Sequence, residues 1–295
     1  MKKPVWLLKT GLFIIVSIAL AILPFRLSMQ VGELFGLLLF YVWGSRKKIA
    51  IENLKKAFLT CPIIISELAE KIVKDNFKNL GRSFVEVIKI YYGFGENIVD
   101  AVDIEGIEHF HDAQSKGKGV LFLTGHCGNW ELLAIVASVK LSGIAIVARP
   151  IDNPYMNKLV EKVRQRYGNS VIYKKGALKP ILHALKKNGC VGILMDQAVV
   201  PDEGYVIDFL GRGAWTTKMP ALIARKTEAA VLPLFIHRTC KGHMVKIYPE
   251  VELSHDADRE NAVKEDTKHF SSFIETYIKE HPSEWLWIHR RWKRV

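Results

Sequence analysis

Short apolar runs and helical patterns alternate through the middle of the chain. Compact runs rich in Val, Ile and Leu predict strands over residues 120–124, 144–148, 191–195 and 231–237. Apolar residues at helical spacing separate the first three strands, over residues 129–141, 154–167 and 177–187. Strands that alternate with helices favour a mostly parallel sheet covered by helices on both faces.

The pattern outside this region predicts the rest of the domain. Helical spacing continues over residues 46–58, 66–90 and 260–280, and residues 244–251 are typical of a further, antiparallel strand. The predicted fold is therefore α/β, with a mostly parallel mixed sheet flanked by helices. We assign this domain to residues 46–295.

Residues 1–45 are predicted to form a membrane anchor with interfacial helices. No charged residue occurs between residues 10 and 25, and a second apolar stretch follows over 34–43. The 21 residues from 5 to 25 would span about 31 Å as a helix, roughly the thickness of the hydrocarbon core. A cleaved signal peptide and a buried helical hairpin are the alternatives. Leu23-Pro24-Phe25-Arg26 makes a poor cleavage site, and the denser positive charge after the run places the domain in the cytoplasm.

The charge of the chain indicates an anionic partner. The 295 residues carry a net charge of +12, and residues 1–60 contain nine Lys or Arg against two acidic residues. Such a surplus suits nucleic acid, anionic lipid or an acidic protein. The four cysteines lie 50 or more residues apart, so the spacing shows no disulfide framework and no zinc pattern. We expect no metal, no cofactor and a reducing compartment.

Polar residues follow three of the predicted strands directly. His126 follows the first strand, Arg149 the second, and Asp196 with Gln197 the third. Ligands of open α/β sheets gather beyond the carboxyl ends of the strands, so these residues predict a site at one sheet edge. Taken singly, Arg149 has the alternative of a surface charge, and Asp196 with Gln197 that of a turn cap.

The segment around His126 predicts a general base. Asn129 is a good N-cap for the following helix, which places Glu131 in the first helical turn. A carboxylate bonded to one imidazole nitrogen fixes the tautomer and makes the other nitrogen a better base. A core histidine beside an unrelated acid is the alternative. Cys127 is a competing nucleophile without a base of its own, and no G-x-S-x-G or phosphate-binding glycine motif occurs.

The His-x₄-Glu spacing resembles the late acyltransferases of lipid A biosynthesis. Stretches of the same family pattern run nearly from end to end: Arg46, Asn53-Leu54, Ala57-Phe58, Ala148-Arg149-Pro150, Met195-Asp196-Gln197, Phe209-Leu210-Gly211, Pro220-Ala221-Leu222, Pro282-Ser283-Glu284-Trp285-Leu286-Trp287 and His289-Arg290-Arg291-Trp292. Related glycerophospholipid acyltransferases have Asp in place of Glu131 and a later Pro-Glu-Gly segment, which this chain lacks. That departure argues against a lysophosphatidate acyltransferase.

The resemblance implies a glycerolipid-acyltransferase-like fold and transfer of a fatty acyl chain from acyl carrier protein to a hydroxyl of a lipid A precursor. His126 would be the base and Glu131 its orienter, while Arg149 would stabilise the oxyanion or hold a phosphate. Asn129, Asp196 and Gln197 would contact the substrate. The implied location is the bacterial inner membrane, with the catalytic domain on its cytoplasmic face.

Two further segments have alternative interpretations. The apolar residues 199–215 fit an acyl-chain groove or the core, and Trp285, Trp287 and Trp292 fit an interfacial belt on anionic lipid or an aromatic core.

The acceptor could be another glycolipid or a phospholipid. A non-enzymatic, basic lipid-binding protein would explain the charge and the anchor, but not the strand-end residues. No motif supports nucleic-acid binding, so lipid and an acidic carrier protein are the expected partners.

Overall fold

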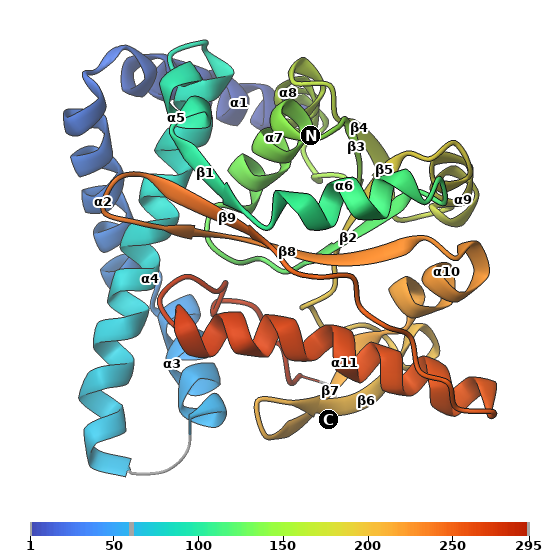
Figure 1. Cartoon of the computed structure of the whole chain (residues 1–295). Helices are drawn as coiled ribbons and strands as arrows, with labels where there is room; N and C mark the ends of the chain where they lie inside the picture. Colours follow the sequence, from blue (N-terminus) through green and yellow to red (C-terminus); the bar gives the residue numbers. More distant parts are fainter. Residues whose placement is uncertain (1, 59–61, 294–295) are drawn as a thin grey trace.

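A seven-stranded sheet forms the centre of the protein in a computed structural model that describes residues 2–58 and 62–293, with side chains from 3 and 67 in these two segments (Figure 1). The strand order is β1-β9-β8-β2-β5-β3-β4, and every neighbouring pair is parallel except β8 and β9. The strands are β1 (Val102–Glu105), β2 (Val120–Thr124), β3 (Ile144–Ala148), β4 (Ser170–Tyr173), β5 (Cys190–Leu194), β8 (Ala230–Arg238) and β9 (His243–Ile247). The predicted mostly parallel mixed sheet is confirmed.

Helices cover both faces of this sheet. They are α5 (Glu96–Asp100), α6 (Ile107–Ser115), α7 (Trp130–Lys140), α8 (Pro154–Arg166), α9 (Leu178–Lys186), α10 (Met219–Thr227) and α11 (Arg259–Glu280). Leu121 and Leu123 of β2 pack into the core beneath α9, α10 and α11, whereas Val120 and Phe122 pack into the core beneath α6 and α7. Because successive side chains of a strand point to opposite faces, a strand buried on both sides reads as a continuous apolar run.

Residues 199–215, which the sequence led us to expect as an apolar loop, contain regular secondary structure, so that expectation is wrong. Residues 201–203 form a short 3-10 helix, and the chain then folds into an antiparallel hairpin of β6 (Gly204–Phe209) and β7 (Arg212–Thr217). Phe209 and Leu210 are buried in the same core as the sheet. These two side chains therefore take the core alternative.

The helices that come first along the chain are α1 (Lys2–Ile22), α2 (Phe25–Val42), α3 (Gly44–Ala57) and α4 (Pro62–Tyr91). Both α1 and α2 are long and apolar enough to cross a membrane, and both keep most of their side chains on the surface. The alternative of a buried hairpin is therefore wrong, and the two helices fit an anchor. Helix α2 packs closely on α4, because a Cβ on Gly36 would lie 2.1 Å from the Phe77 carbonyl oxygen.

A C-terminal strap, residues 282–292, crosses the edge of the sheet. Asn53 of α3 donates to the carbonyls of Trp287 and His289, and Asn76 of α4 donates to those of Ser283 and Trp285. The indoles of Trp285 and Trp287 are fully buried and meet edge to face. The interfacial belt is therefore wrong for these two tryptophans, which belong to the aromatic core.

Candidate active site

The loop that carries His126 joins the end of β2 to the start of α7. Gly128 has a φ of +55°, and a Cβ there would lie 2.0 Å from the Ile236 carbonyl oxygen, so only glycine fits the position. The strap fastens the loop, since Gly128 donates to the Glu284 carbonyl and Leu286 donates to the His126 carbonyl. The loop is thus held from β8 and from the strap.

His126 is hydrogen-bonded to Asp196, which follows β5, the neighbour of β2 in the sheet. Nδ1 of His126 lies 2.8 Å from Oδ1 of Asp196, and Trp285 of the strap donates to Oδ2 at 2.9 Å. The Asp196 side chain is 2% exposed, whereas the imidazole of His126 is 22% exposed. The sheet therefore holds a buried carboxylate behind a histidine that substrate can reach.

The charges around the imidazole favour its protonated form. Burial lowers the pKa of His126, but the charge and hydrogen bond of Asp196 outweigh it, aided by the charge of Glu131, so the pKa lies above its ordinary value. Burial raises the pKa of Asp196. The charge of His126 and the hydrogen bonds that His126 and the Trp285 indole make to Asp196 outweigh this effect, so the pKa of Asp196 lies well below its usual range. The pair is built to exchange a proton at His126 while Asp196 stays ionised.

Glu131 occupies the predicted first turn of α7 but has a different partner. Both of its carboxylate oxygens accept from the guanidinium of Arg164 on α8, at 3.0 and 2.5 Å. Among the described residues, no hydrogen bond joins Glu131 to His126. The predicted orienting hydrogen bond is therefore wrong in this structure, because Asp196 takes Nδ1 and Arg164 takes the carboxylate. Glu131 still acts on His126 through its charge.

The other predicted site residues are divided between the site, the interior and the surface. The amide nitrogen of Gln197 lies 3.3 Å from Nε2 of His126, and the Trp130 ring packs edge-on against the imidazole. Asn129 is 3% exposed and caps α7 by accepting from Leu132, so the expected contact with substrate is wrong for this residue. Arg149 is 84% exposed, with Asp152 at 3.9 Å, and lies outside the His126 cluster.

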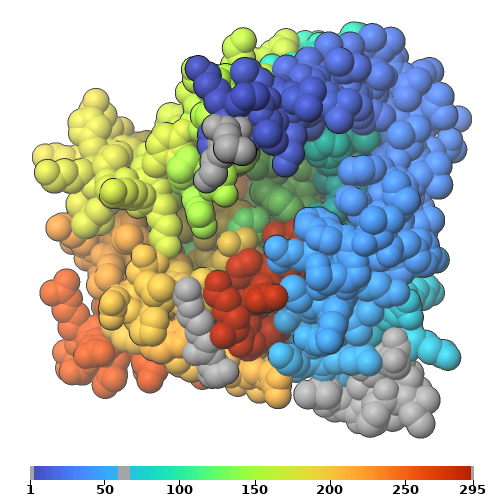
Figure 2. All heavy atoms as spheres, turned by 180° about the vertical axis from the view of Figure 1, so that it is seen from behind, coloured from blue at the N-terminus to red at the C-terminus, as the bar shows by residue number. Residues whose placement is uncertain are grey.

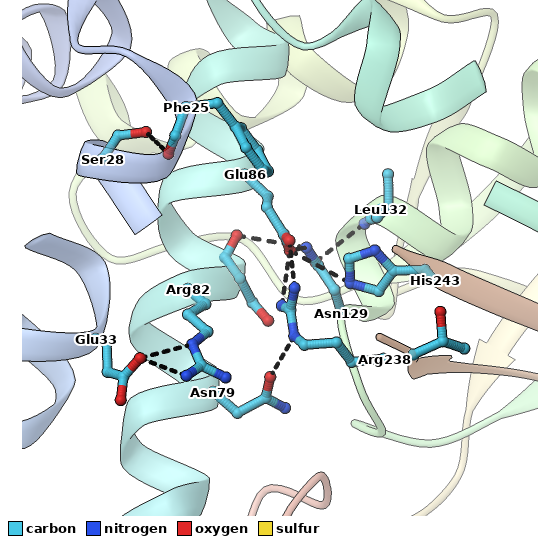
Figure 3. Close-up of polar contacts among 12 residues, drawn as sticks. Phe25, Ser28, Glu33, Asn79, Arg82, Glu86, Asn129, Leu132, Arg238 and His243 are labelled. Atoms are coloured by element: carbon cyan, nitrogen blue, oxygen red, sulfur yellow. Dashed lines mark hydrogen bonds and ion pairs between the residues drawn. The ribbon is translucent and has the colours of Figure 1, made fainter. Parts of the chain in front are cut away.

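A buried polar network behind the loop was not predicted from the sequence (Figure 3). Glu86 of α4 forms a bidentate ion pair with Arg238 at the end of β8 and accepts from the Asn129 amide at 2.8 Å. Arg238 also donates to Asn79, and burial lowers the pKa of the adjacent His243 to about 4. The network holds the N-cap of α7, and thus one end of the His126 loop. Only the capping tendency of Asn129 gave a signal for it.

Cys127 is not a nucleophile in this arrangement. Its thiol is fully buried. Burial is the main cause that raises the pKa of Cys127 well above its ordinary value, and the charges of Asp196 and Glu284 raise it further. A thiol in this state is inert, because the thiolate is the reactive form.

The face of the molecule opposite to that of Figure 1 is recessed at its centre (Figure 2). Helix α1 borders the recess above and α3 borders it beside the red C-terminal segment, with green atoms deep inside.

A strand-end histidine with a buried carboxylate partner, on an α/β sheet flanked by helices, is an arrangement typical of enzymes that use a general base. A sequence model described as "Bacterial lipid A biosynthesis acyltransferase" matches residues 2–294. The chain belongs to this family, and it is an acyltransferase.

Individual relatives carry related names. The chain is 26% identical to the lipid A biosynthesis palmitoleoyltransferase of Escherichia coli over 92% of its length and 86% of the relative. It is also 26% identical to the lipid A biosynthesis lauroyltransferase of the same organism, over 92% of this chain and 87% of the relative. A phosphatidylinositol mannoside acyltransferase of Mycolicibacterium smegmatis is 20% identical over 77% of this chain and 74% of the relative. A crystal structure of the Thermotoga maritima 1-acyl-sn-glycerophosphate acyltransferase aligns with a TM-score of 0.37 and 16% identity, over 83% of this chain and 97% of that one.

Proposed function

We propose that the protein transfers a fatty acyl chain from acyl carrier protein to a hydroxyl of a lipid A precursor, which is a secondary acylation. Family membership supports the acceptor, since the E. coli relatives are named for lipid A biosynthesis. The observation that carries the chemistry is the hydrogen bond of 2.8 Å between His126 and the buried Asp196.

His126 is the general base of the proposed reaction. With the Nδ1 proton donated to Asp196, Nε2 carries the lone pair that removes the proton of the acceptor hydroxyl. The hydroxyl oxygen attacks the thioester carbonyl and forms a tetrahedral oxyanion. The C–S bond then breaks, and the imidazolium returns the proton to the departing thiolate. Asp196 stabilises the imidazolium between these steps as a positioning residue, because it is too buried to touch substrate.

Glu131 and Arg149 support this reaction through charge. Glu131 favours the imidazolium from the first turn of α7 while Arg164 neutralises part of its charge. The exposure of Arg149 favours contact with a substrate phosphate at the rim over contact with the oxyanion. Gln197 lies beside the basic nitrogen and donates a hydrogen bond to bound substrate in this proposal.

The proposed location is the cytoplasmic face of the bacterial inner membrane, where acyl carrier protein is available. The net charge of +12 favours encounter with an acidic carrier protein and with anionic lipid. A second acceptor class has support from one comparison, because some relatives are named phosphatidylinositol mannoside acyltransferases. The acceptor is then a different glycolipid, with the same base and the same thioester chemistry.

The test is transfer by the purified, detergent-solubilised protein. Acyl carrier protein thioesters of several chain lengths are offered with a lipid A precursor or a phosphatidylinositol mannoside, and products are read by mass spectrometry. We expect one acyl chain to be added to the lipid A precursor, and His126→Ala to abolish the addition. His183→Ala is the matched control, because His183 is exposed on α9. Addition only to the mannoside would replace the acceptor, and full activity of His126→Ala would reject the mechanism.

A further inference from the structure

Helix α1 is fastened to the catalytic domain along most of its length by polar side chains. Asn153, the N-cap of α8, donates to Thr10 at 3.0 Å, and the Ser17 hydroxyl lies 2.8 Å from that of Tyr92. Lys89 of α4 donates to the carbonyls of Ala21 and Leu23 at the end of the helix. These attachments extend over about 20 Å of helix at 1.5 Å per residue. The buried face of α1 is therefore a protein contact that contains polar partners.

The opposite face of α1 is apolar and open. Leu8 is 75% exposed and Leu12 is 63% exposed, and Ile15 and Ile22 project to the same degree. Spacings of four, three and seven residues place these side chains along one side of the helix. A helix whose polar groups are bonded to the domain on one face can present an apolar stripe to lipid without crossing the bilayer.

Helix α2 repeats this arrangement against α4. Gly32 and Gly36 let its backbone approach Gly81 of α4, and Glu33 at the middle of α2 is ion-paired with Arg82 and Lys78. Its outer face exposes a second set of large side chains: Leu34, Leu38, Tyr41 and Val42. A carboxylate and two cations halfway along a spanning helix would lie at the bilayer centre, where charges are costly.

The two helices run in different directions over the same side of the molecule. Helix α1 crosses the top while α2 descends along α4, so both cannot follow the bilayer normal (Figure 1). Phe84 of α4 joins them, with ring centroids 5.9 Å from Phe13 and 6.2 Å from Phe35. Figure 2 shows both helices bordering the recessed face. We propose that α1 and α2 lie in the membrane plane within one leaflet, and that the recess opens onto that leaflet.

The charges near these helices favour an anionic leaflet as the occupant. Lys3, Lys9 and Arg26 are exposed at the ends and along the length of the two helices, where they can reach lipid phosphates. An enzyme seated in this way receives a lipid acceptor sideways from the leaflet, while a water-soluble donor approaches from the other side of the rim.

Cysteine labelling distinguishes the in-plane arrangement from a span. Lys3→Cys, Arg26→Cys and Asp202→Cys are made singly in full-length protein that carries Cys61→Ser and Cys240→Ser. Sealed inverted and right-side-out membrane vesicles are treated with a membrane-impermeant maleimide. We expect all three positions to be labelled from the same side. Labelling of residue 3 from the opposite side to residue 202 would overturn the proposal in favour of a single span. Labelling of residue 26 alone from the opposite side would overturn it in favour of a spanning hairpin.

Vesicle binding tests the apolar stripe itself. The purified triple variant Leu8→Gln, Leu12→Gln, Ile15→Gln is compared with the wild type on phosphatidylethanolamine–phosphatidylglycerol vesicles by flotation. We expect partition to weaken by on the order of tenfold or more, because each of the three apolar side chains loses its burial in acyl chains. Val139→Gln with Leu178→Gln removes exposed apolar side chains elsewhere and should leave partition unchanged. Equal partition of the triple variant would reject the stripe as the lipid contact, and neither measurement depends on acyl transfer.

Discussion

Replacing Asp196 with Asn removes one charge from the centre of the site with little change in shape. Asp196 accepts from His126 at 2.8 Å and from Trp285 at 2.9 Å, and its side chain is 2% exposed. Asn has one acceptor oxygen, so it cannot serve both donors, and its NH₂ group faces an N–H. The substitution therefore removes the charge that stabilises the imidazolium, and it leaves one buried donor unpaired at about 1–3 kcal/mol of folding stability.

We expect Asp196→Asn to lower kcat by about 10²–10⁴-fold, the usual contribution of a positioned general base. This loss corresponds to about 2.7–5.5 kcal/mol of transition-state stabilisation. The base must be neutral to act, so kcat/KM rises with pH through the pKa of His126. Asp196 raises that pKa against the effect of burial, and its removal should move the rising limb to lower pH.

The assay is initial-rate acyl transfer from an acyl carrier protein thioester across a pH series, together with thermal unfolding in the same detergent. Asp202→Asn is the matched control, because Asp202 is an exposed acid on the connection that follows β5. A folded Asp196→Asn variant with wild-type kcat and an unmoved pH limb would refute the pairing of His126 with Asp196 as the catalytic unit.

Substitutions at three further positions test the supports of the site by thermal unfolding and activity. Glu86→Gln breaks the buried pair with Arg238 and should cost about 3–5 kcal/mol; unchanged stability would mean that the pair is dispensable. Gly128→Ala places a Cβ 2.0 Å from a carbonyl oxygen at a φ of +55° and should lower the free energy of unfolding by about 1–3 kcal/mol and also reduce activity. Wild-type stability and activity of this variant would show that glycine is not required there. Trp287→Ala empties a fully buried site and should cost about 3–5 kcal/mol, with Trp287→Phe losing less; equal losses would indicate that volume is not the cause.

The sheet could be predicted because its central strands are buried on both faces. Residues 120–123 and 144–148 are uninterrupted apolar runs, and the structure places strands over residues 120–124 and 144–148. The edge strands β1 and β4 gave no such signal, since their mixed burial leaves polar residues in the pattern. The hairpin of β6 and β7 was missed for the same reason, because its exposed positions interrupt the apolar run.

The proximity of three strand-end side chains could be predicted from the sequence, but their hydrogen bonding could not. Parallel strands bring residues after β2 and β5 together, which is why His126, Asp196 and Gln197 lie within hydrogen-bond reach. The choice of Asp196 over Glu131 as the partner of Nδ1 depends on Arg164, which lies on another helix, 33 residues after Glu131. Side-chain pairing at such a separation depends on packing between elements, and spacing along the chain does not encode it.

The C-terminal strap gives the enzyme a built-in order of assembly. Trp285 contacts Asp196 across 89 residues of sequence and Asn76 across 209. The ribosome therefore completes helices α1 to α4, the sheet and the His126 loop before it makes the segment that fastens them. The Trp285 bond to Asp196 can therefore form only after the last residues of the domain have been made. Contacts of such long range also raise the contact order of the fold, which is associated with slower folding.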